Sequence, residues 1–476
     1  MIKKLESKLN NSFFLRTFLT TTKKKNSNKN NYQVPETKSS NEISLWQLIK
    51  EDGFVLAKGA VEDYLEDRKA LKQQRLIQKR KTQKFFVIGT PIWVHRYFPS
   101  VISNHLLNYP SPTNLNYFWG FGSLALLFLG VQIITGILLA MHYVPHMDLA
   151  FASVEHIMRN VKHGWQLRYL HANGASFMFI TVYVHMLRGM YFGSYNKPNH
   201  HLWFSGILIY FLMVATAFMG YVLPWGQMSF WAATVITNLF SAIPFVGESI
   251  VEWLWGGFSV DNATLKRFFS LHYLLPFAIL GLAFVHIVIL HINGSNNPLG
   301  YVETNDKIQF IGYFLIKDVV GIILILIIYC YFVFYDPNFL SHPLNNVMAN
   351  PMVTPPHIVP EWYFLPLYAI LRSIPNKLGG VIAMVLGIVI LAVLPFVAKS
   401  VYQMTFTRKF YNLSFWLFFV NACILGWIGQ KHVEMPYILI GQVSSILYFA
   451  YFLIILPLIV YFEGFVISEI AKKKIN

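Results

Sequence analysis

The stretch RYLHANGASFMFITVYVHMLR, residues 168–188, decides the fold of this chain. It is long enough to cross a bilayer, yet it carries His171 and His185, fourteen residues apart. Fourteen residues are almost four helical turns, so both imidazoles lie on one helix face, about 21 Å apart along the axis. Because ionisable side chains in a membrane span are costly and functional by default, the stretch predicts a membrane helix with two functional levels.

The composition of the whole chain predicts many such helices. Of its 476 residues, 55% are hydrophobic and 13% are charged, whereas a soluble domain carries about 25% charged residues. Eight stretches are long enough to cross a bilayer of ~30 Å: residues 116–144, 168–192, 202–223, 268–292, 314–335, 378–398, 411–430 and 437–462. We therefore expect an all-α polytopic membrane protein with eight transmembrane helices.

Charge and composition divide the sequence into three parts. Residues 1–85 form a basic N-terminal extension, expected to be partly disordered and, over residues 42–84, an amphipathic helix. Residues 86–300 hold the first four spans and residues 301–476 the last four, while residues 224–267 are expected to form a surface helical hairpin. An excess of Lys and Arg marks the negative side of a membrane, so both termini are expected on that side. The same excess gives no reason to expect nucleic acid as a partner.

A second histidine pair repeats the first. His272 and His286 lie in the fourth span, again fourteen residues apart. The second and fourth spans run in the same direction because an even number of crossings separates them, so His171 is expected opposite His272 and His185 opposite His286. Two matched levels of facing imidazoles predict a bound metal or haem at each level.

Glycines with the same spacing favour haem over a bare metal ion. Gly122 and Gly136 in the first span are fourteen residues apart, and so are Gly206 and Gly220 in the third. A flat macrocycle needs such clearance and a zinc ion does not, although ordinary small-residue packing is the alternative explanation. Two imidazoles fill both axial positions of a haem iron, which favours electron transfer over oxygen chemistry.

The other residues near the histidines agree with haem. Arg168 and Arg188 stand three residues outside the histidines of the second span, where they are expected to pair with haem propionates or, alternatively, to snorkel to the interface. The only cysteines, Cys330 and Cys423, lie in apolar runs without a CxxCH motif, so covalent haem attachment is excluded.

Several motifs resemble the mitochondrial cytochrome b family. They stand at residues 168–179, 185–195, 215–238, 256–269, 294–300 and 355–380. The chloroplast type divides its helices over two chains and spaces its second histidine pair by fifteen, so the respiratory type is the more similar. The resemblance covers about residues 100–465. It implies a di-haem four-helix bundle in the N-terminal half, with two non-covalent b-type haems. It further implies the catalytic cytochrome b subunit of quinol:cytochrome c reductase (respiratory complex III), in the mitochondrial inner membrane.

The resemblance also implies a route for electrons. One electron from ubiquinol leaves to a Rieske iron–sulfur protein, and the other crosses two haems to ubiquinone, contributing to proton translocation in a Q cycle. His171 and His272 would hold the low-potential haem, and His185 and His286 the high-potential one. The implied partners are the Rieske protein, cytochrome c1 and other complex III subunits, a second copy in a dimeric complex, and lipids. Residues 1–85 are expected to reach supercomplex contacts, and both termini to lie in the matrix.

The family pattern implies a quinol-oxidation site around the PEWY segment. Glu361 is the only acidic residue between Asp336 and Glu434, and a carboxylate beside the pocket is suited to accept a proton from quinol. The other residues expected at this site are Tyr221, Tyr363, Phe218, Pro360 and Ala232. Ala232 stands where the family generally has glycine, so its methyl group is expected to narrow the pocket.

A quinone-reduction site is expected at the opposite face of the membrane. His291 lies five residues beyond His286, and Asp318 with Lys317 begins the fifth span on the same side. A histidine and an aspartate at the two carbonyls would bind quinone and relay protons. Ser295 lies in the loop between them.

Two other classes of protein remain open at this stage. In a transporter or channel the histidines would relay protons, but that class predicts a broken helix or an inverted repeat near the midplane, and neither is visible. A structural membrane subunit would need no cofactor. A visible absorption spectrum separates both from a haem protein.

Overall fold

The computed structural model describes residues 108–300, 306–398 and 408–475, with side chains up to residue 466. Residues 109–470 form one compact unit. The N-terminal extension at residues 1–85, with its expected amphipathic helix and partner contacts, lies outside the described residues. The division of the sequence at residue 300 stays a proposal.

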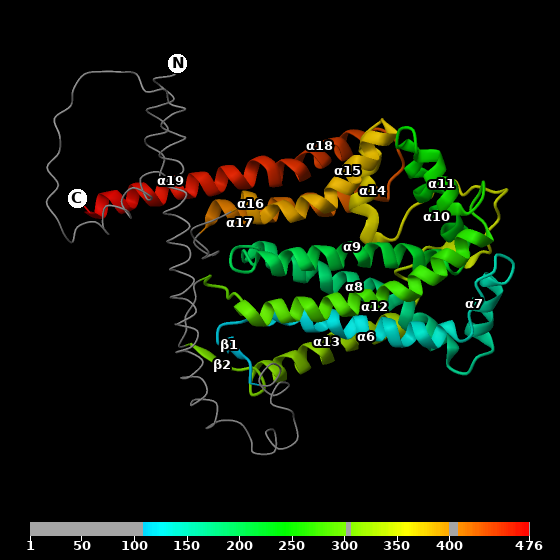
Figure 1. The fold of residues 1–476 in the computed structure, drawn as a ribbon, viewed down its shortest axis with the longest axis horizontal. Coiled ribbons are helices and arrows are strands. Elements are labelled where there is room, and N and C mark those ends of the chain that lie inside the picture. Colours follow the sequence, from blue (N-terminus) through cyan, green and yellow to red (C-terminus); the bar gives the residue numbers. More distant parts are fainter. Residues whose placement is uncertain (1–107, 301–305, 399–407, 476) are drawn as a thin grey trace, which may run out of the picture. The chain divides into compact units, whose positions relative to one another are not determined.

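Long helices make up most of the compact unit (Figure 1). The first group is η2 (Tyr117–Gly120) leading into α6 (Phe121–Ala140), α8 (Gly164–Tyr191), α9 (His200–Val222) and α12 (Asn262–Asn293). The second group is α13 (Phe314–Phe334), α15 (Lys377–Val389) continued by η6 (Ile390–Val393) and α16 (Leu394–Val397), α17 (Lys409–Gly429), and α18 (Tyr437–Ala450) continued by η8 (Tyr451–Ile455) and α19 (Leu456–Ile475). The predicted all-α membrane architecture is confirmed.

Seven of the described helices are long and apolar enough by themselves to cross a membrane, and α8 is not among them. Its 28 residues are sufficient in length, but polar side chains lower its hydropathy. Among these, Asn173, Ser176 and Thr181 are buried, so the polar face of α8 points into the protein. Since α8 packs along α6 and its Tyr183 hydroxyl lies 3.3 Å from that of Tyr210 on α9, we treat it as the eighth span.

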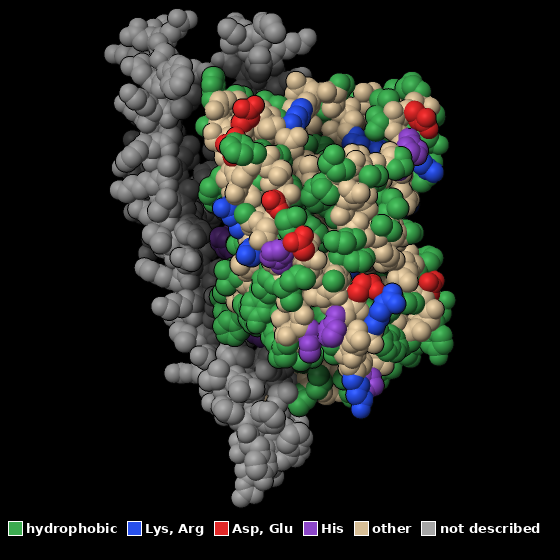
Figure 2. Space-filling model, turned by 90° about the vertical axis from the view of Figure 1, so that its right-hand side faces the viewer, with side chains coloured by type: hydrophobic (Ala, Val, Ile, Leu, Met, Phe, Trp, Pro, Cys, Tyr) green, Lys and Arg blue, Asp and Glu red, His purple; other side chains and the backbone are tan. Residues whose placement is uncertain are grey.

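Short helices close one end of the bundle, which we call the α10 end (Figure 1). They are α7 (Ala150–Arg159), α10 (Gln227–Asn238), η3 (Leu239–Ala242) and α11 (Gly247–Trp255), with η4 (Pro343–Asn346), η5 (Trp362–Phe364) and α14 (Leu365–Ser373) in the connection to α15. Helices α10 and α11 form the hairpin expected over residues 224–267. Figure 2 shows this end with extensive hydrophobic surface and scattered charges, and Phe245, Trp253 and Phe258 are exposed, as suits a membrane interface.

The opposite end, which we call the β1 end, contains the only sheet among the described residues. Strand β1 (Pro110–Pro112) pairs antiparallel with β2 (Lys307–Gln309), with Ser111 opposite Ile308. The sheet joins the segment before α6 to the segment before α13.

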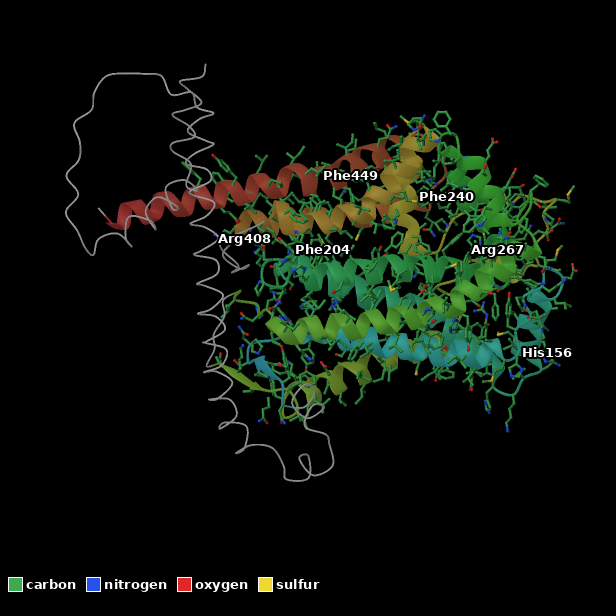
Figure 3. The ribbon with its side chains drawn as sticks, viewed as in Figure 1. His156, Phe204, Phe240, Arg267, Arg408 and Phe449 are labelled. Carbon is green, nitrogen blue, oxygen red and sulfur yellow. The ribbon has the colours of Figure 1, made fainter. Side chains whose placement is uncertain are left out.

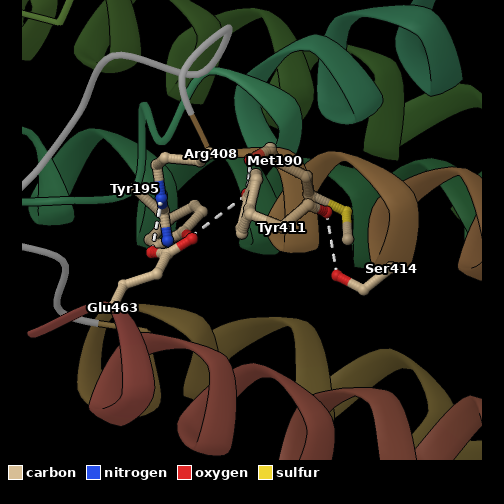
Figure 4. Close-up of polar contacts among 6 residues, drawn as sticks. All are labelled: Met190, Tyr195, Arg408, Tyr411, Ser414 and Glu463. Atoms are coloured by element: carbon tan, nitrogen blue, oxygen red, sulfur yellow. Dashed lines mark hydrogen bonds and ion pairs between the residues drawn. The ribbon is translucent and has the colours of Figure 1, made fainter. Parts of the chain in front are cut away.

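A buried ion pair fastens the last helices at the β1 end (Figures 3 and 4). Arg408 Nε lies 2.8 Å from Glu463 Oε2, with side chains only 6% and 14% exposed. The Arg408 guanidinium also lies 4.1 Å from the centre of the Tyr411 ring, and the Tyr411 hydroxyl donates to the carbonyl of Met190 at the end of α8. The cluster therefore links α8, α17 and α19.

Candidate functional site

Two histidine pairs stand at two levels between α8 and α12. The ring centroids of His171 and His272 are 6.1 Å apart, and those of His185 and His286 are 6.4 Å apart. Imidazole nitrogens bind transition metals at about 2.0–2.1 Å, which sets the centroids of two rings sharing one metal about 6 Å apart. Each pair therefore has the spacing that one shared metal requires.

Three of the four imidazoles have an acceptor at Nδ1. His171 Nδ1 lies 2.9 Å from Thr135 Oγ1, His286 Nδ1 lies 2.7 Å from Ser205 Oγ, and His272 Nδ1 lies 2.8 Å from the Thr216 carbonyl. A metal-binding histidine commonly donates its second ring N–H to such a partner, which fixes the tautomer and the orientation of the ring. These three histidines thus present Nε2 for ligation.

The fourth imidazole has a different neighbour. His185 Nδ1 lies 3.2 Å from an Arg188 nitrogen, and a guanidinium has donors but no acceptor. An Nδ1–H is incompatible with that contact, so metal binding at Nε2 of His185 requires Arg188 to turn away. The Arg188 Nε has no hydrogen-bond partner and lies buried, which leaves this arginine available for an anionic group.

A glycine from a neighbouring helix faces each imidazole. A β-carbon at Gly136 would lie 3.1 Å from His171 Cε1, at Gly122 3.2 Å from His185 Cε1, at Gly206 3.3 Å from His286 Cε1, and at Gly220 2.3 Å from His272 Cε1. The four predicted glycines therefore clear space for the ligand rings themselves.

A large cavity opens at the level of His171 and His272. Its empty space is about 1740 Å³ with the open mouth included. The predicted site residues that line it are His171, His272, Arg168, Gly136, Gly220, Tyr221, Glu361 and Tyr363. Cofactor and quinol residues thus share one cavity.

Three residues expected at the quinol-oxidation site do not line this cavity. Ala232 is buried in α10, the Phe218 ring packs 5.8 Å from that of Phe268, and Pro360 precedes Glu361. Their contact with quinol stays a prediction.

Glu361 stands immediately before η5, in the loop between η4 and α14. Burial raises the pKa of its carboxyl to about 7, and the Tyr221 hydroxyl and the Arg168 charge oppose this rise. Near neutral pH the group is therefore poised between its acid and its base, as proton transfer requires.

The residues expected at the quinone-reduction site all lie at the β1 end. Asp318 Oδ2 accepts a hydrogen bond from Ser123 Oγ at 2.8 Å, whereas Lys317 Nζ donates to the Leu115 carbonyl at 2.7 Å. Asp318 and Lys317 are therefore neighbours in sequence but have different hydrogen-bond partners. Ser295 Oγ donates to the Asn296 carbonyl at 3.0 Å.

Sequence reasoning missed two residues at this end. The Tyr109 ring lies 4.3 Å from that of His291, centroid to centroid, and Ser123 bonds Asp318. Tyr109 precedes the first span and meets the end of the fourth, whereas Ser123 begins the first span and meets the fifth, so only the packing of these spans brings both residues to the site.

The fold and the site define a class: a polytopic helical membrane protein whose bundle presents two levels of facing histidines. A family model described as cytochrome b/b6/petB matches residues 106–294, and one described as cytochrome b (C-terminal)/b6/petD matches residues 348–449. The chain belongs to the cytochrome b family, which implies b-type haem binding.

Relatives and a solved structure agree with this assignment. The cytochrome b of Chondrus crispus is 58% identical over 376 residues, covering 79% of this chain and 99% of the relative. That of Cyanidium caldarium is 59% identical over 368 residues, covering 77% and 96%. A chain of a hyperthermophilic respiratory complex III is 33% identical, with a TM-score of 0.74, covering 78% of this chain and 98% of that one.

Proposed function

We propose that this chain is the cytochrome b subunit of a quinol:cytochrome c reductase and conducts electrons across the membrane between two quinone sites. The observation that carries the proposal is the pair of imidazole levels on α8 and α12, at 6.1 and 6.4 Å. Among the described residues, no group of three or more His, Cys, Asp or Glu could hold a metal ion. A haem would complete each site, because its own ring supplies the remaining ligands of the iron.

The four histidines would hold two b-type haems, His171 with His272 and His185 with His286. When bound, a haem with two imidazole ligands accepts and releases one electron without an open position for oxygen. Arg188, which has to leave His185, is placed to pair with a propionate of its level. Arg168 lines the cavity at the other level and has the same role there.

Quinol oxidation is assigned to the cavity at the α10 end. Ubiquinol releases two protons with its two electrons, and Glu361 accepts one in its carboxylate form. Tyr221 and Tyr363 line the same cavity and shape its polar wall. At this face the Rieske protein would take one of the two electrons and pass it on to cytochrome c1. The other electron would stay with this chain for transfer across the membrane.

Quinone reduction is assigned to the β1 end, where His291 and Asp318 supply a donor and a proton source. Ser123 holds the Asp318 carboxylate in place through its hydrogen bond. The positive charge of residues 1–84 supports placing this end on the negative side, the matrix side of the mitochondrial inner membrane.

The test is a reduced-minus-oxidised spectrum of the purified complex, wild type and single variants. Six-coordinate b-type haem gives a sharp reduced alpha band. His185→Leu should remove only the haem at the β1 end, and His171→Leu only the haem at the α10 end. Retention of both haems with unshifted bands in either variant would refute the pairing, and absence of haem in the wild type would favour a transporter or a structural subunit.

A further inference from the structure

The turn that follows Glu361 is fastened to one face of α8. The indole Nε1 of Trp362 donates to Ser176 Oγ at 3.0 Å. The Tyr363 ring stacks on that of Phe179, with centroids 4.0 Å apart and an interplanar angle of 5°. Since residues three and four apart on a helix are neighbours, these two contacts follow one stripe of α8.

Tyr183, one turn further along this stripe, supplies a third contact. Its hydroxyl donates to the backbone carbonyl of Tyr363 at 2.5 Å and lies 3.3 Å from the hydroxyl of Tyr210 on α9. A phenol has one hydrogen to donate, so the Tyr363 carbonyl takes the hydrogen of Tyr183 and the oxygen of Tyr183 accepts from Tyr210. The buried Tyr210 therefore orients the Tyr183 hydroxyl.

We propose that Tyr183 is a positioning residue for quinol oxidation: its hydroxyl, oriented by Tyr210, holds the Tyr363 carbonyl and thereby fixes Glu361 in the cavity. The inference rests on the proposed role of Glu361. Phenylalanine at position 183 would keep the ring and its packing but leave the carbonyl without this donor.

The physical reason is that Tyr363 is buried, and buried backbone carbonyls are nearly always paired. Without the hydroxyl the turn has to shift or admit water to satisfy its carbonyl. A shift of about 1 Å at a reacting group can lower the rate about a hundredfold. Water near the turn would also hydrate the Glu361 carboxyl.

The experiment uses the purified complex with Tyr183→Phe and follows ubiquinol oxidation across pH. We expect kcat/KM to fall about three- to thirtyfold, with both haem alpha bands at their wild-type positions. Because hydration relieves the burial that raises the Glu361 pKa, the acidic limb of the pH profile should move to lower pH. Tyr210→Phe should give a smaller change in the same direction.

Tyr411→Phe is the matched control, since the Tyr411 hydroxyl also donates to a backbone carbonyl of α8, that of Met190, and lies beside a second phenol, that of Tyr195, but at the β1 end. It should oxidise ubiquinol like the wild type. Ser176→Ala removes the hydrogen bond from Trp362 to α8 and should move the acidic limb of the pH profile in the same direction. It therefore tests whether the docking of the turn positions Glu361 if Tyr183→Phe does not assemble.

The inference would be overturned if Tyr183→Phe kept the wild-type kcat/KM and the wild-type position of the acidic limb of the pH profile. It would also be overturned if Tyr183→Phe and Tyr411→Phe lost activity equally at every pH. The role of Glu361 is tested separately by Glu361→Gln. If that variant keeps the wild-type pH profile, the proposed function of Glu361 fails, whatever Tyr183 does.

Discussion

A β-carbon at Gly220 would lie 2.3 Å from Cε1 of His272, closer than any real contact allows. A β-carbon at Gly206, fourteen residues before Gly220 on α9, would lie 3.3 Å from Cε1 of His286. We therefore expect Gly220→Ala to displace the imidazole and weaken or abolish haem binding at the α10 end, at an overpacking cost of about 1–3 kcal/mol.

Gly206→Ala is the matched control because it makes the same change on the same helix. It should retain both haems in the reduced-minus-oxidised spectrum, with at most a shifted band at the β1 end. Equal haem content in the two variants would show that the His272 ring has room to move.

Turnover should depend on pH through Glu361. Its carboxylate accepts the proton, and burial raises its pKa to about 7, so half of the groups are active near that pH. The rate should rise with pH through this pKa and level off above it. Glu361→Gln should remove the limb and slow ubiquinol oxidation by about 10²–10⁴-fold, with unchanged haem spectra.

The control for this prediction is Glu434→Gln, the same change at an exposed acid. It should leave the pH profile of ubiquinol oxidation in place. Wild-type turnover of Glu361→Gln at every pH would exclude a proton-accepting role.

The buried pair of Arg408 and Glu463 predicts a stability effect that a surface pair lacks. Removing one partner leaves the other charge buried alone, which costs about 3–5 kcal/mol. Arg408→Ala should therefore lower the thermal midpoint of the solubilised complex. In contrast, Arg159 and Glu155 are 77% and 40% exposed, so Arg159→Ala should change nothing measurable. Similar midpoints for the two variants would show that the buried pair contributes little.

Quinone reduction should respond to Ser123, a residue outside the conventional acid–base set. Ser123→Ala removes the hydrogen bond that orients the Asp318 carboxylate, and we expect a smaller loss than Asp318→Asn gives. The measurement is the reoxidation of reduced haem by added ubiquinone. Ser270→Ala is the control, because its hydroxyl bonds only to its own helix. An unchanged rate in Asp318→Asn would contradict the assignment of the site.

Spacing along single helices is what the sequence predicts well. The fourteen-residue periods of the histidines and glycines translate directly into two levels because the helical repeat is fixed. The acceptors at Nδ1, Thr135 and Ser205, could not be found that way, since they depend on how neighbouring helices rotate. The contact between Tyr183 and Tyr363 joins residues 180 positions apart, and no local pattern marks it.

The sequence equally could not show which side chains face a cavity that several elements enclose. The motifs predict Phe218 and Ala232 in the wall of the oxidation site, but neither lines the cavity, and their contact with quinol stays a prediction. The loop carrying Glu361 is proline-rich and lacks a period, so only the docking of its turn on α8 determines where the carboxyl lies.

The polarity of α8 has a consequence for biogenesis. This helix holds two histidines and the buried Asn173, Ser176 and Thr181, and it falls short of the apolarity that the seven other spans possess. Each central polar residue opposes partition of a lone helix into lipid. The nascent α8 should therefore enter the bilayer together with α6, which packs along it, and its Asn173 and Ser176 side chains should lack their final partners until Pro337 and Trp362 of the C-terminal half reach them.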